Sequence, residues 1–413
     1  GAINLKDAPY LRRILVWGNA SRPWASPGPE TLASAAAASP AIDDALLREI
    51  EASISPADDL VVICTSGTTA EPKAVVHTHG SAIRSTFAFA PILGVLPHDK
   101  IVNAMPYFWV GGWLRAIMPA LFEGAAIVSP PTLNAADIIE TVLTERVSFL
   151  NFSAGGGIHD FAQEVARRGA DLSFVRIGFG PYRDDNGAGE IIPAEEQAAS
   201  QLGMTETFGT HSGESQHIRQ PHGKGGNWGR PMPGIERRIV DIETGEILGA
   251  NQQGELQVRG HTLMRGYLKR EYSDVFTPDG FFATGDRCSI DEDDYLYFQG
   301  RVKELIKSAG ANVSPREVEA VLASYPEIRE AMVFGVPDKR KGQGVAAIVV
   351  PVDIEGFDAD AIRTRIKSEI SSYKVPSVII PMANADIPRT GSGKPKKNEL
   401  LEIYLALQNA SVA

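Results

Sequence analysis

Cysteine is nearly absent from the sequence: Cys64 and Cys288 are the only two among 413 residues. Two thiols cannot build a disulfide framework, so we expect a reducing cytoplasm and predict that both side chains are buried free thiols. Apolar residues never run for the length of a bilayer-spanning helix, so no transmembrane segment is expected. The net charge of −11 argues against a broad nucleic-acid-binding surface.

The length of the chain predicts more than one domain, because 413 residues exceed the usual size of a single core. Near the start, residues 13–18 indicate a buried strand, and residues 19–59 a surface loop with one helix over 42–53. Residues 60–64 form a short apolar run that again predicts a buried strand.

Five small residues follow that run, four of them with hydroxyl groups: Thr65, Ser66, Gly67, Thr68 and Thr69. Such a loop can bring N–H groups and hydroxyls close to phosphate oxygens, and Lys73 adds a mobile positive charge. An ordinary polar turn between a strand and a helix is the alternative at this point. The loop of the common nucleotide hydrolases is excluded, since no Gly-Lys-Ser/Thr follows.

Three later motifs carry further candidates for chemistry. Glu206, in Gly203-Met-Thr-Glu, is a candidate Mg²⁺ ligand if it lies beside bound phosphates, although in isolation a solvated glutamate is the simpler interpretation. Asp286, in Thr284-Gly-Asp, can accept hydrogen bonds from both ribose hydroxyls, although alone it marks a turn. Lys394 lies among glycines that predict a mobile loop, for which a basic surface loop is the alternative.

The order of the predicted elements indicates an α/β fold. Strands and helices alternate over residues 79–168, which favours parallel sheets with helices on both faces. Turn signals over about 229–300 predict a small antiparallel barrel. Ser314 and Pro315 then begin a helix, and strands at 331–336, 346–350 and 378–381 with a helix at 360–372 complete a small α/β unit. We therefore expect a large domain, 1–302, and a small mobile domain, 303–413, after a hinge at Lys303.

Together these motifs resemble those of the adenylate-forming enzymes, which include acyl-CoA synthetases, peptide-synthetase adenylation domains and beetle luciferases. Residues 303–307 and 313–319 are most similar to the carboxylate–CoA ligases. The resemblance covers residues 61–397 and implies a ligase that uses ATP and Mg²⁺ to form an acyl-adenylate, releases pyrophosphate and transfers the acyl group to CoA. The small-molecule acid, ATP and CoA are the expected partners, and a homodimer is a further expectation.

The resemblance also assigns residues to roles. The nucleotide and its phosphates would contact Thr65, Ser66, Gly67, Thr68, Thr69, Lys73, Gly180, Pro181, Leu202, Gly203, Asp286 and Arg301. Mg²⁺ would be held by Glu206 and Thr65. Catalysis is assigned to Lys394, Glu206 and Thr205, and the thioester step to Lys307 and Gly310.

The acyl pocket would be lined by Trp109, Val110, Gly111, Gly112 and Phe179, which predicts an apolar acid, aromatic or aliphatic. This chain departs from the family pattern at Ala70 and Ala74, which replace glycines, at Trp109, which replaces a histidine, and at Leu202, which replaces an aromatic residue. The family usually carries a longer segment before residue 1, so part of the N-terminal fold is expected to be missing. Three alternatives stay open: an adenylation domain that loads a carrier protein, a luciferase-like oxygenase, and an inactive fragment.

Overall fold

The computed structural model describes residues 6, 10–18, 23–38, 43–65, 73–152, 157–178, 201–215, 220–308, 311–338, 342–390 and 393–410. The chain divides into two units, Gly1–Asp58 and Asp59–Ala413, of which the second contains all the motifs above. In the described part, no helix has the length and apolar character needed to cross a bilayer.

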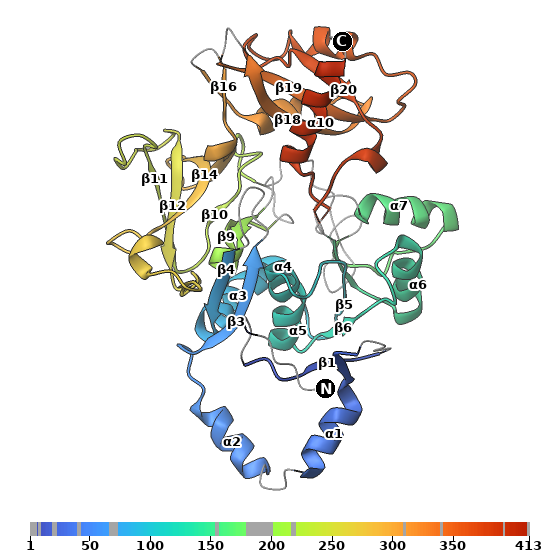
Figure 1. The fold of residues 1–413 in the computed structure, drawn as a ribbon, viewed down its shortest axis with the longest axis vertical. Coiled ribbons are helices and arrows are strands. Elements are labelled where there is room, and N and C mark those ends of the chain that lie inside the picture. Colours follow the sequence, from blue (N-terminus) through green and yellow to red (C-terminus); the bar gives the residue numbers. More distant parts are fainter. Residues whose placement is uncertain are drawn as a thin grey trace. The chain divides into compact units, whose positions relative to one another are not determined.

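The first unit contains two short strands and two helices. Strand β1 (Ile14–Val16) pairs in parallel with β2 (Ala25–Pro27), and helices α1 (Gly28–Ala38) and α2 (Asp44–Ser53) follow (Figure 1). The Asp43 side chain caps α2 by accepting a hydrogen bond from the Leu46 N–H. The predicted strand is half-buried rather than buried, and α1 occupies part of the predicted loop because its alanine-rich end favours a helix.

The second unit begins with an antiparallel hairpin of β3 (Asp59–Thr65) and β4 (Lys73–Thr78). Strand β4 also pairs with β13 (Gly266–Tyr267), which leaves β3 at the edge of the described sheet. The prediction of a buried strand is therefore wrong for most of β3, where only Ile63 is buried. Cys64 is exposed for the same reason, whereas Cys288 is buried as predicted.

A parallel sheet follows in the chain, as the alternation of strands and helices predicted. Its strands are β5 (Lys100–Asn103), flanked by β6 (Ala126–Val128) and β7 (Phe149–Asn151). Three helices accompany it: α3 (His79–Leu93), α6 (Ala135–Glu145) and α7 (Gly157–Arg168). Val102 and Leu150 of the sheet pack with Ile138, Ile139 and Phe161 of α6 and α7 into one apolar cluster (Figure 1).

A helix with an irregular middle turn runs from Val110 to Glu123. It consists of α4 (Val110–Gly112), a π-helical turn η1 (Trp113–Ile117) and α5 (Met118–Glu123). Pro119 explains the irregularity, since it has no N–H to donate to the carbonyl of Arg115 and its ring would collide with that carbonyl in a regular α-helix. The Met118 N–H bonds instead to the Trp113 carbonyl, five residues earlier.

An antiparallel sheet occupies the region predicted as a barrel. Its strands pair in the order β11 (Ile235–Val240), β12 (Gly254–Gly260), β14 (Phe282–Ile290) and β15 (Leu296–Arg301). A second antiparallel group contains β8 (Leu202–Met204), β9 (Gly209–Gly213) and β10 (Arg230–Pro231). Two 3₁₀ turns, η3 (Thr205–Thr207) and η4 (Tyr272–Asp274), join these strands to their neighbours.

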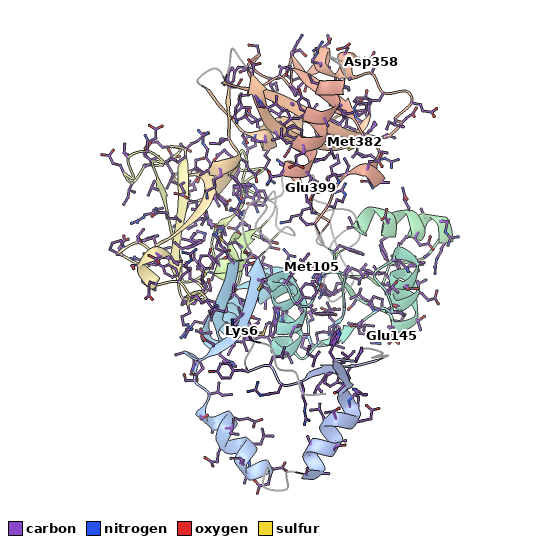
Figure 2. The ribbon with its side chains drawn as sticks, viewed as in Figure 1. Lys6, Met105, Glu145, Asp358, Met382 and Glu399 are labelled. Carbon is purple, nitrogen blue, oxygen red and sulfur yellow. The ribbon has the colours of Figure 1, made fainter. Side chains whose placement is uncertain are left out.

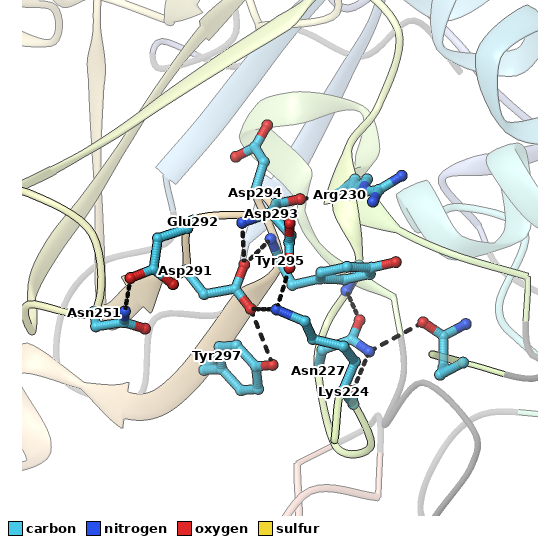
Figure 3. Close-up of polar contacts among 12 residues, drawn as sticks. Lys224, Asn227, Arg230, Asn251, Asp291, Glu292, Asp293, Asp294, Tyr295 and Tyr297 are labelled. Atoms are coloured by element: carbon cyan, nitrogen blue, oxygen red, sulfur yellow. Dashed lines mark hydrogen bonds and ion pairs between the residues drawn. The ribbon is translucent and has the colours of Figure 1, made fainter. Parts of the chain in front are cut away.

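A polar cluster ties the loop before β10 to the turn between β14 and β15 (Figure 3). The Lys224 ammonium contacts Asp291 at 2.6 Å and Asp293 at 2.7 Å, and Tyr297 donates a hydrogen bond to Asp291. The Arg230 guanidinium stacks on the ring of Tyr295 with 4.6 Å between centres. These contacts fix the hairpin whose strands carry Asp286 and Arg301.

The C-terminal part has its own sheet, in which β19 (Gly342–Pro351) pairs with β18 (Ile328–Asp338), β20 (Val378–Pro381) and β16 (Ile306–Ser308). Strand β17 (Ala311–Val313) extends it beyond β16. The helices are α8 (Pro315–Ala323), α9 (Ala359–Ile366) and α10 (Lys397–Ala410), with 3₁₀ turns η5 (Val302–Glu304) and η6 (Asn384–Asp386).

Side-chain packing and capping account for the helices of this part. Ser314 caps α8 by accepting from the Glu317 N–H, as predicted. Helix α9 is shorter than predicted, since the Ser368 hydroxyl bonds the Arg365 carbonyl in the turn that follows. Helix α10 buries Leu400 and Tyr404 in an apolar cluster against which Met382, labelled in Figure 2, packs.

Candidate functional site

The hairpin β3–β4 brings two predicted phosphate-binding residues together. Thr65 and Lys73 are paired opposite each other where the two strands meet the intervening loop. The loop therefore joins two antiparallel strands and not a strand and a helix. Ser66, Gly67, Thr68 and Thr69 lie outside the described residues, as does Ala70.

Tyr267, which the motifs did not indicate, links this hairpin to Glu206. Its hydroxyl donates a hydrogen bond of 2.7 Å to Glu206 Oε1. The Lys73 ammonium lies 4.8 Å from the centroid of the same ring. Burial, and then the charge of Glu206, raise the pKa of Tyr267 far above its ordinary value, so the hydroxyl remains a donor. The only sign of Tyr267 in the sequence was a tyrosine in a turn-rich segment. Its contacts could not be predicted, because Lys73 and Glu206 are distant from it in the sequence.

The Thr205–Glu206 turn is fastened from two sides. His77 Nε2 donates to the Thr205 carbonyl at 2.6 Å, which ties η3 to β4. Burial lowers the pKa of His77 to about 4, although the Thr205 bond acts in the opposite direction, so the ring is neutral at pH 7. Phe208, directly after the turn, is buried with φ at 49°, a left-handed conformation that a bulky residue rarely adopts. Such backbone strain is frequent at functional sites.

Asp286 and Arg301 face each other on the paired strands β14 and β15. Arg301 Nε lies 3.0 Å from Asp286 Oδ1, and the Asp286 side chain is buried. Burial raises the pKa of Asp286 to about 6; Arg301 opposes this, and the nearby charges of Glu206, Glu304 and Glu255 add to it. Among the described residues, Oδ1 has this ion pair but no hydrogen bond, and the atom is buried.

Leu202 and Gly203 have structural roles that are visible in the packing. Leu202 is buried in the apolar cluster that contains Ile239 and Val258. Gly203 lies so close to β9 that an added Cβ would come within 2.2 Å of the Gly209 carbonyl oxygen. Only glycine permits this approach, which places Thr205 and Glu206 at the end of β8.

The described residues assigned to the mobile small domain lie on three separate elements. Lys303 is exposed in η5, between β15 and β16. Lys394 is exposed on a hairpin closed by the pairing of Arg389 with Pro395 and anchored by an ion pair between Arg389 and Glu330. Lys307 belongs to β16, its side chain lies outside the described residues, and so does Gly310.

The set of residues assigned to the acyl pocket is described only in part, since Phe179 lies outside the described residues, as do Gly180 and Pro181 of the predicted nucleotide contacts. The Trp109 ring meets that of Phe108 edge-on, with 5.8 Å between centroids. Val110 is half-buried and begins α4. Gly112 is needed by the chain itself, since a Cβ there would come within 2.4 Å of the Pro106 carbonyl oxygen. A Cβ on Gly111 would meet only the end of the flexible Met105 side chain, labelled in Figure 2.

A cavity of about 190 Å³ lies at the carboxyl end of the parallel sheet. Asn151 ends β7 there, and Gly178 follows Ile177, which bridges to β7. Ligands of open α/β sheets bind at this edge. The lining residues are Ile92, Leu93, Arg115, Phe149, Leu150, Asn151, Phe152, Ile158, Ile177, Gly178 and Gln201. None of the four described residues predicted to line the acyl pocket is among them, whereas Arg115, three positions beyond Gly112, is.

Comparison with known proteins places these elements in a family. The AMP-binding enzyme family matches residues 13–268, and the AMP-binding enzyme C-terminal domain matches residues 317–394. The 2-succinylbenzoate–CoA ligase of Bacillus licheniformis is 32% identical over 86% of this chain and 72% of its own length. The indoleacetate–CoA ligase of Aromatoleum aromaticum is 29% identical over 87% of this chain and 70% of its own.

A solved structure agrees with these relatives. The o-succinylbenzoate coenzyme A synthetase of Bacillus subtilis, in complex with ATP and a magnesium ion, superposes with a TM-score of 0.67 at 26% identity and covers 84% of this chain and 71% of that one. The resemblance predicted from the motifs is thus confirmed, as is the α/β fold. The chain belongs to the AMP-binding enzyme family and, among the adenylate-forming enzymes, stands with the carboxylate–CoA ligases.

Proposed function

We propose that the chain is an ATP-dependent carboxylate–CoA ligase that forms an acyl-adenylate, releases pyrophosphate and transfers the acyl group to CoA. One observation carries the proposal: Tyr267 joins Lys73 to Glu206, so that a cation and a carboxylate meet where the strands β4 and β13 lie side by side. A triphosphate with its metal ion needs both kinds of group in one place.

The nucleotide ribose would bind at Asp286. Its backbone is fixed by the Thr284 hydroxyl, which accepts from the Asp286 N–H at 3.1 Å and donates to the Leu256 carbonyl at 2.8 Å. A carboxylate held in this way can accept hydrogen bonds from two hydroxyl donors. Arg301 stays beside the same carboxylate and donates to the Thr284 carbonyl at 3.0 Å, which leaves part of its guanidinium for the nucleotide.

Mg²⁺ would be held by Glu206, with Thr65 near the phosphates. Among the described residues, no three histidine, cysteine or acidic side chains gather into a metal cage. That fits Mg²⁺, which commonly takes one or two protein carboxylates and completes its shell with phosphate oxygens and water. When bound, the ion would neutralise phosphate charge, and Tyr267 would keep the Glu206 carboxylate oriented toward it.

Catalysis by positioning and charge follows from these residues. The substrate carboxylate attacks the α-phosphorus of ATP and the bond to pyrophosphate breaks, while Lys394 and Thr205 stabilise the charge that develops on the oxygens. The CoA thiolate then attacks the acyl carbon and AMP leaves. The small domain, 303–413, would turn about Lys303 between the two steps and bring Lys307 and Gly310 to the acyl-adenylate.

Two features support that domain division. The sheet of β16 to β20 has an apolar core of its own, and Lys303 lies in an exposed turn before it.

The proposal extends to a cytoplasmic setting, where the exposed Cys64 would stay reduced, and to a homodimer, which light scattering of the purified chain would test.

Pyrophosphate exchange tests the function. We expect the chain to incorporate labelled pyrophosphate into ATP when an acid is supplied and to form a CoA thioester when CoA is added. Exchange without thioester formation would favour a carrier-protein acceptor, and light emission or oxygen consumption would favour an oxygenase. No exchange with any acid would favour an inactive fragment. The named substrates of the two relatives differ in structure, so a panel of acids is required.

A further inference from the structure

Arg115 is a partly buried cation without an acidic partner in the described part of the chain. Its Nη2 donates to Gln201 Oε1 at 2.5 Å, and its guanidinium lies 5.4 Å from the centroid of the Phe89 ring. Both contacts are to neutral groups. Burial lowers the pKa of Arg115, and no carboxylate of the described residues acts against that effect. Two other buried arginines differ: Arg176 pairs with Asp99, and Arg237 with Asp294.

A guanidinium that has lost water without gaining an anion is costly, so such groups are normally paired. The remaining surface of Arg115 belongs to the cavity at the sheet edge. Seven of the eleven lining residues are apolar, and polar groups, among them the neutral amides of Gln201 and Asn151, share the exposed wall with them. The cavity therefore presents one positive charge among neutral groups. An anion that enters it would find a partner with fixed, fork-like donor geometry.

The local backbone aims Arg115 in this direction. Arg115 lies in the π-helical turn η1 that Pro119 imposes. Single π turns within helices are frequent at functional sites. Gln201, the partner of Arg115, directly precedes β8, whose end carries Thr205. The four residues from Gln201 to Thr205 reach at most about 14 Å, so the cavity and the adenylation residues are within reach of one small molecule.

We propose that Arg115 binds a second carboxylate on the acid substrate, so that the preferred substrates are dicarboxylic acids with an apolar middle. This inference rests on the proposed function and names its substrate class. One carboxylate would be activated near Thr205, while the other pairs with Arg115 and the chain between them contacts Ile92, Phe152 and Ile177. A volume of about 190 Å³, below the roughly 300–1,000 Å³ of sites for drug-sized ligands, suits a small acid.

The test compares matched acids in pyrophosphate exchange. Glutaric, adipic and suberic acids are measured beside their monomethyl esters, which keep the length and lose one charge. We expect the wild type to prefer the diacids. Arg115→Met should raise KM for the diacid by about 10–100-fold, the usual cost of a lost charge-assisted pair, while KM for ATP stays unchanged and the half-ester loses little. Arg115→Lys should lie between, since it keeps the charge without the fork.

Arg167→Met serves as the matched control, because Arg167 is an exposed arginine of α7 whose ion pair among the described residues is with Glu164. It should leave the ratio of diacid to half-ester activity unchanged. Equal use of diacids and half-esters by the wild type would overturn the inference, as would an unchanged ratio in Arg115→Met. If that variant does not fold, the ratio in Arg115→Lys decides in the same way.

A binding measurement separates this inference from the proposed ligase activity. If no acid supports exchange, the proposed function fails. Even then, diacids should raise the melting temperature of the wild type and leave that of Arg115→Met unchanged. Where Arg115→Met is unfolded, diacids should raise the melting temperature of Arg115→Lys by less than that of the wild type. Stabilisation of wild type and variant to the same degree, or of neither, would show that Arg115 has no anionic ligand.

Discussion

The hydroxyl of Tyr267 donates a 2.7 Å hydrogen bond to Oε1 of Glu206, while the ring of the same tyrosine lies under the ammonium of Lys73. One side chain from β13 thereby fixes two groups that are far apart in the sequence. Because Glu206 is buried, its orientation depends on this donor.

Tyr267→Phe should weaken metal-dependent activity without unfolding the protein. The ring and its contact with Lys73 remain, but Glu206 loses the donor that orients it. We expect the Mg²⁺ concentration for half-maximal pyrophosphate exchange to rise about 10-fold, which corresponds to a lost hydrogen bond to a charged group. Tyr272→Phe, at a 58% exposed tyrosine stacked on Phe276, is the control and should behave as the wild type. An unchanged Mg²⁺ requirement in Tyr267→Phe would contradict the assignment of Glu206.

Lys394→Ala should separate the two half-reactions. A lysine delivered to the developing charge acts mainly in the transition state of adenylation, so its loss should lower acyl-adenylate formation by about 10²–10³-fold. Thioester formation from supplied acyl-adenylate and CoA should be retained. Lys396→Ala, which removes a neighbouring exposed lysine paired with Glu399, is the control. Equal loss of both half-reactions, with the fold intact, would show that Lys394 does not act in adenylation alone.

Lys303→Pro should have the opposite effect. Proline fixes φ and removes the backbone N–H, so it hampers a rotation that passes through this residue. We expect adenylation to continue and the thioester step to slow. Single-turnover measurement of each step, started from ATP and acid or from acyl-adenylate and CoA, checks the prediction. A variant that performs both steps at wild-type rates would place the hinge elsewhere.

Asp286→Asn should weaken ATP binding and raise the stability of the fold at neutral pH. The raised pKa of Asp286, about 6, means that its folded carboxyl favours the proton. The stability that this group contributes is therefore complete below about pH 4 and lost as the pH rises through about 6. The neutral amide avoids this loss, worth at most about 3 kcal/mol, so the variant should melt at a higher temperature than the wild type at pH 7.5 but not at pH 4. Its KM for ATP should rise about 10–100-fold. A lower melting temperature at pH 7.5 would contradict the argument.

Acid should destabilise the fold through two buried histidines. Burial lowers the pKa of His77 to about 4, and burial with the charges of Arg237 and Arg301 lowers that of His211 to about 3. In the unfolded chain both titrate near 6.5, so the unfolded state binds more protons between these values. The free energy of unfolding should fall from about pH 7 to pH 4, by about 1.4 kcal/mol per pH unit for each histidine. Denaturant titrations at several pH values check this, and His77→Gln should reduce the slope. A slope unchanged by that substitution would exclude His77 as a source.

The sequence was sufficient for many of the elements but not for α1, for the end of α9 or for every contact. Local patterns identified β5, α6, β12 and the cap of α8, because periodicity and capping depend on neighbouring residues. Burial of β3 was overestimated, since an apolar run does not reveal whether its strand lies at a sheet edge.

In the candidate site too, the sequence predicted some residues and missed others. Asp286 and Arg301 were recognisable from their motifs, and the structure pairs them. Tyr267 and Arg115 were missed, because their importance comes from contacts with Glu206, Lys73 and Gln201 across the fold. The available signal for Arg115 was a single charge within the apolar run 113–122, over which no individual element was predicted.

The π turn at Arg115 has a consequence for how the cavity can change. A π turn accommodates one residue more than the α-helix that surrounds it. Deletion of one residue within 113–117, combined with Pro119→Ala, would restore a regular helix and rotate the preceding segment by about 100° relative to α5. The cation could then leave the cavity without any substitution of Arg115. Related sequences can therefore gain or lose the binding of a dicarboxylic acid through an insertion or deletion in this helix, as well as through a substitution of the arginine.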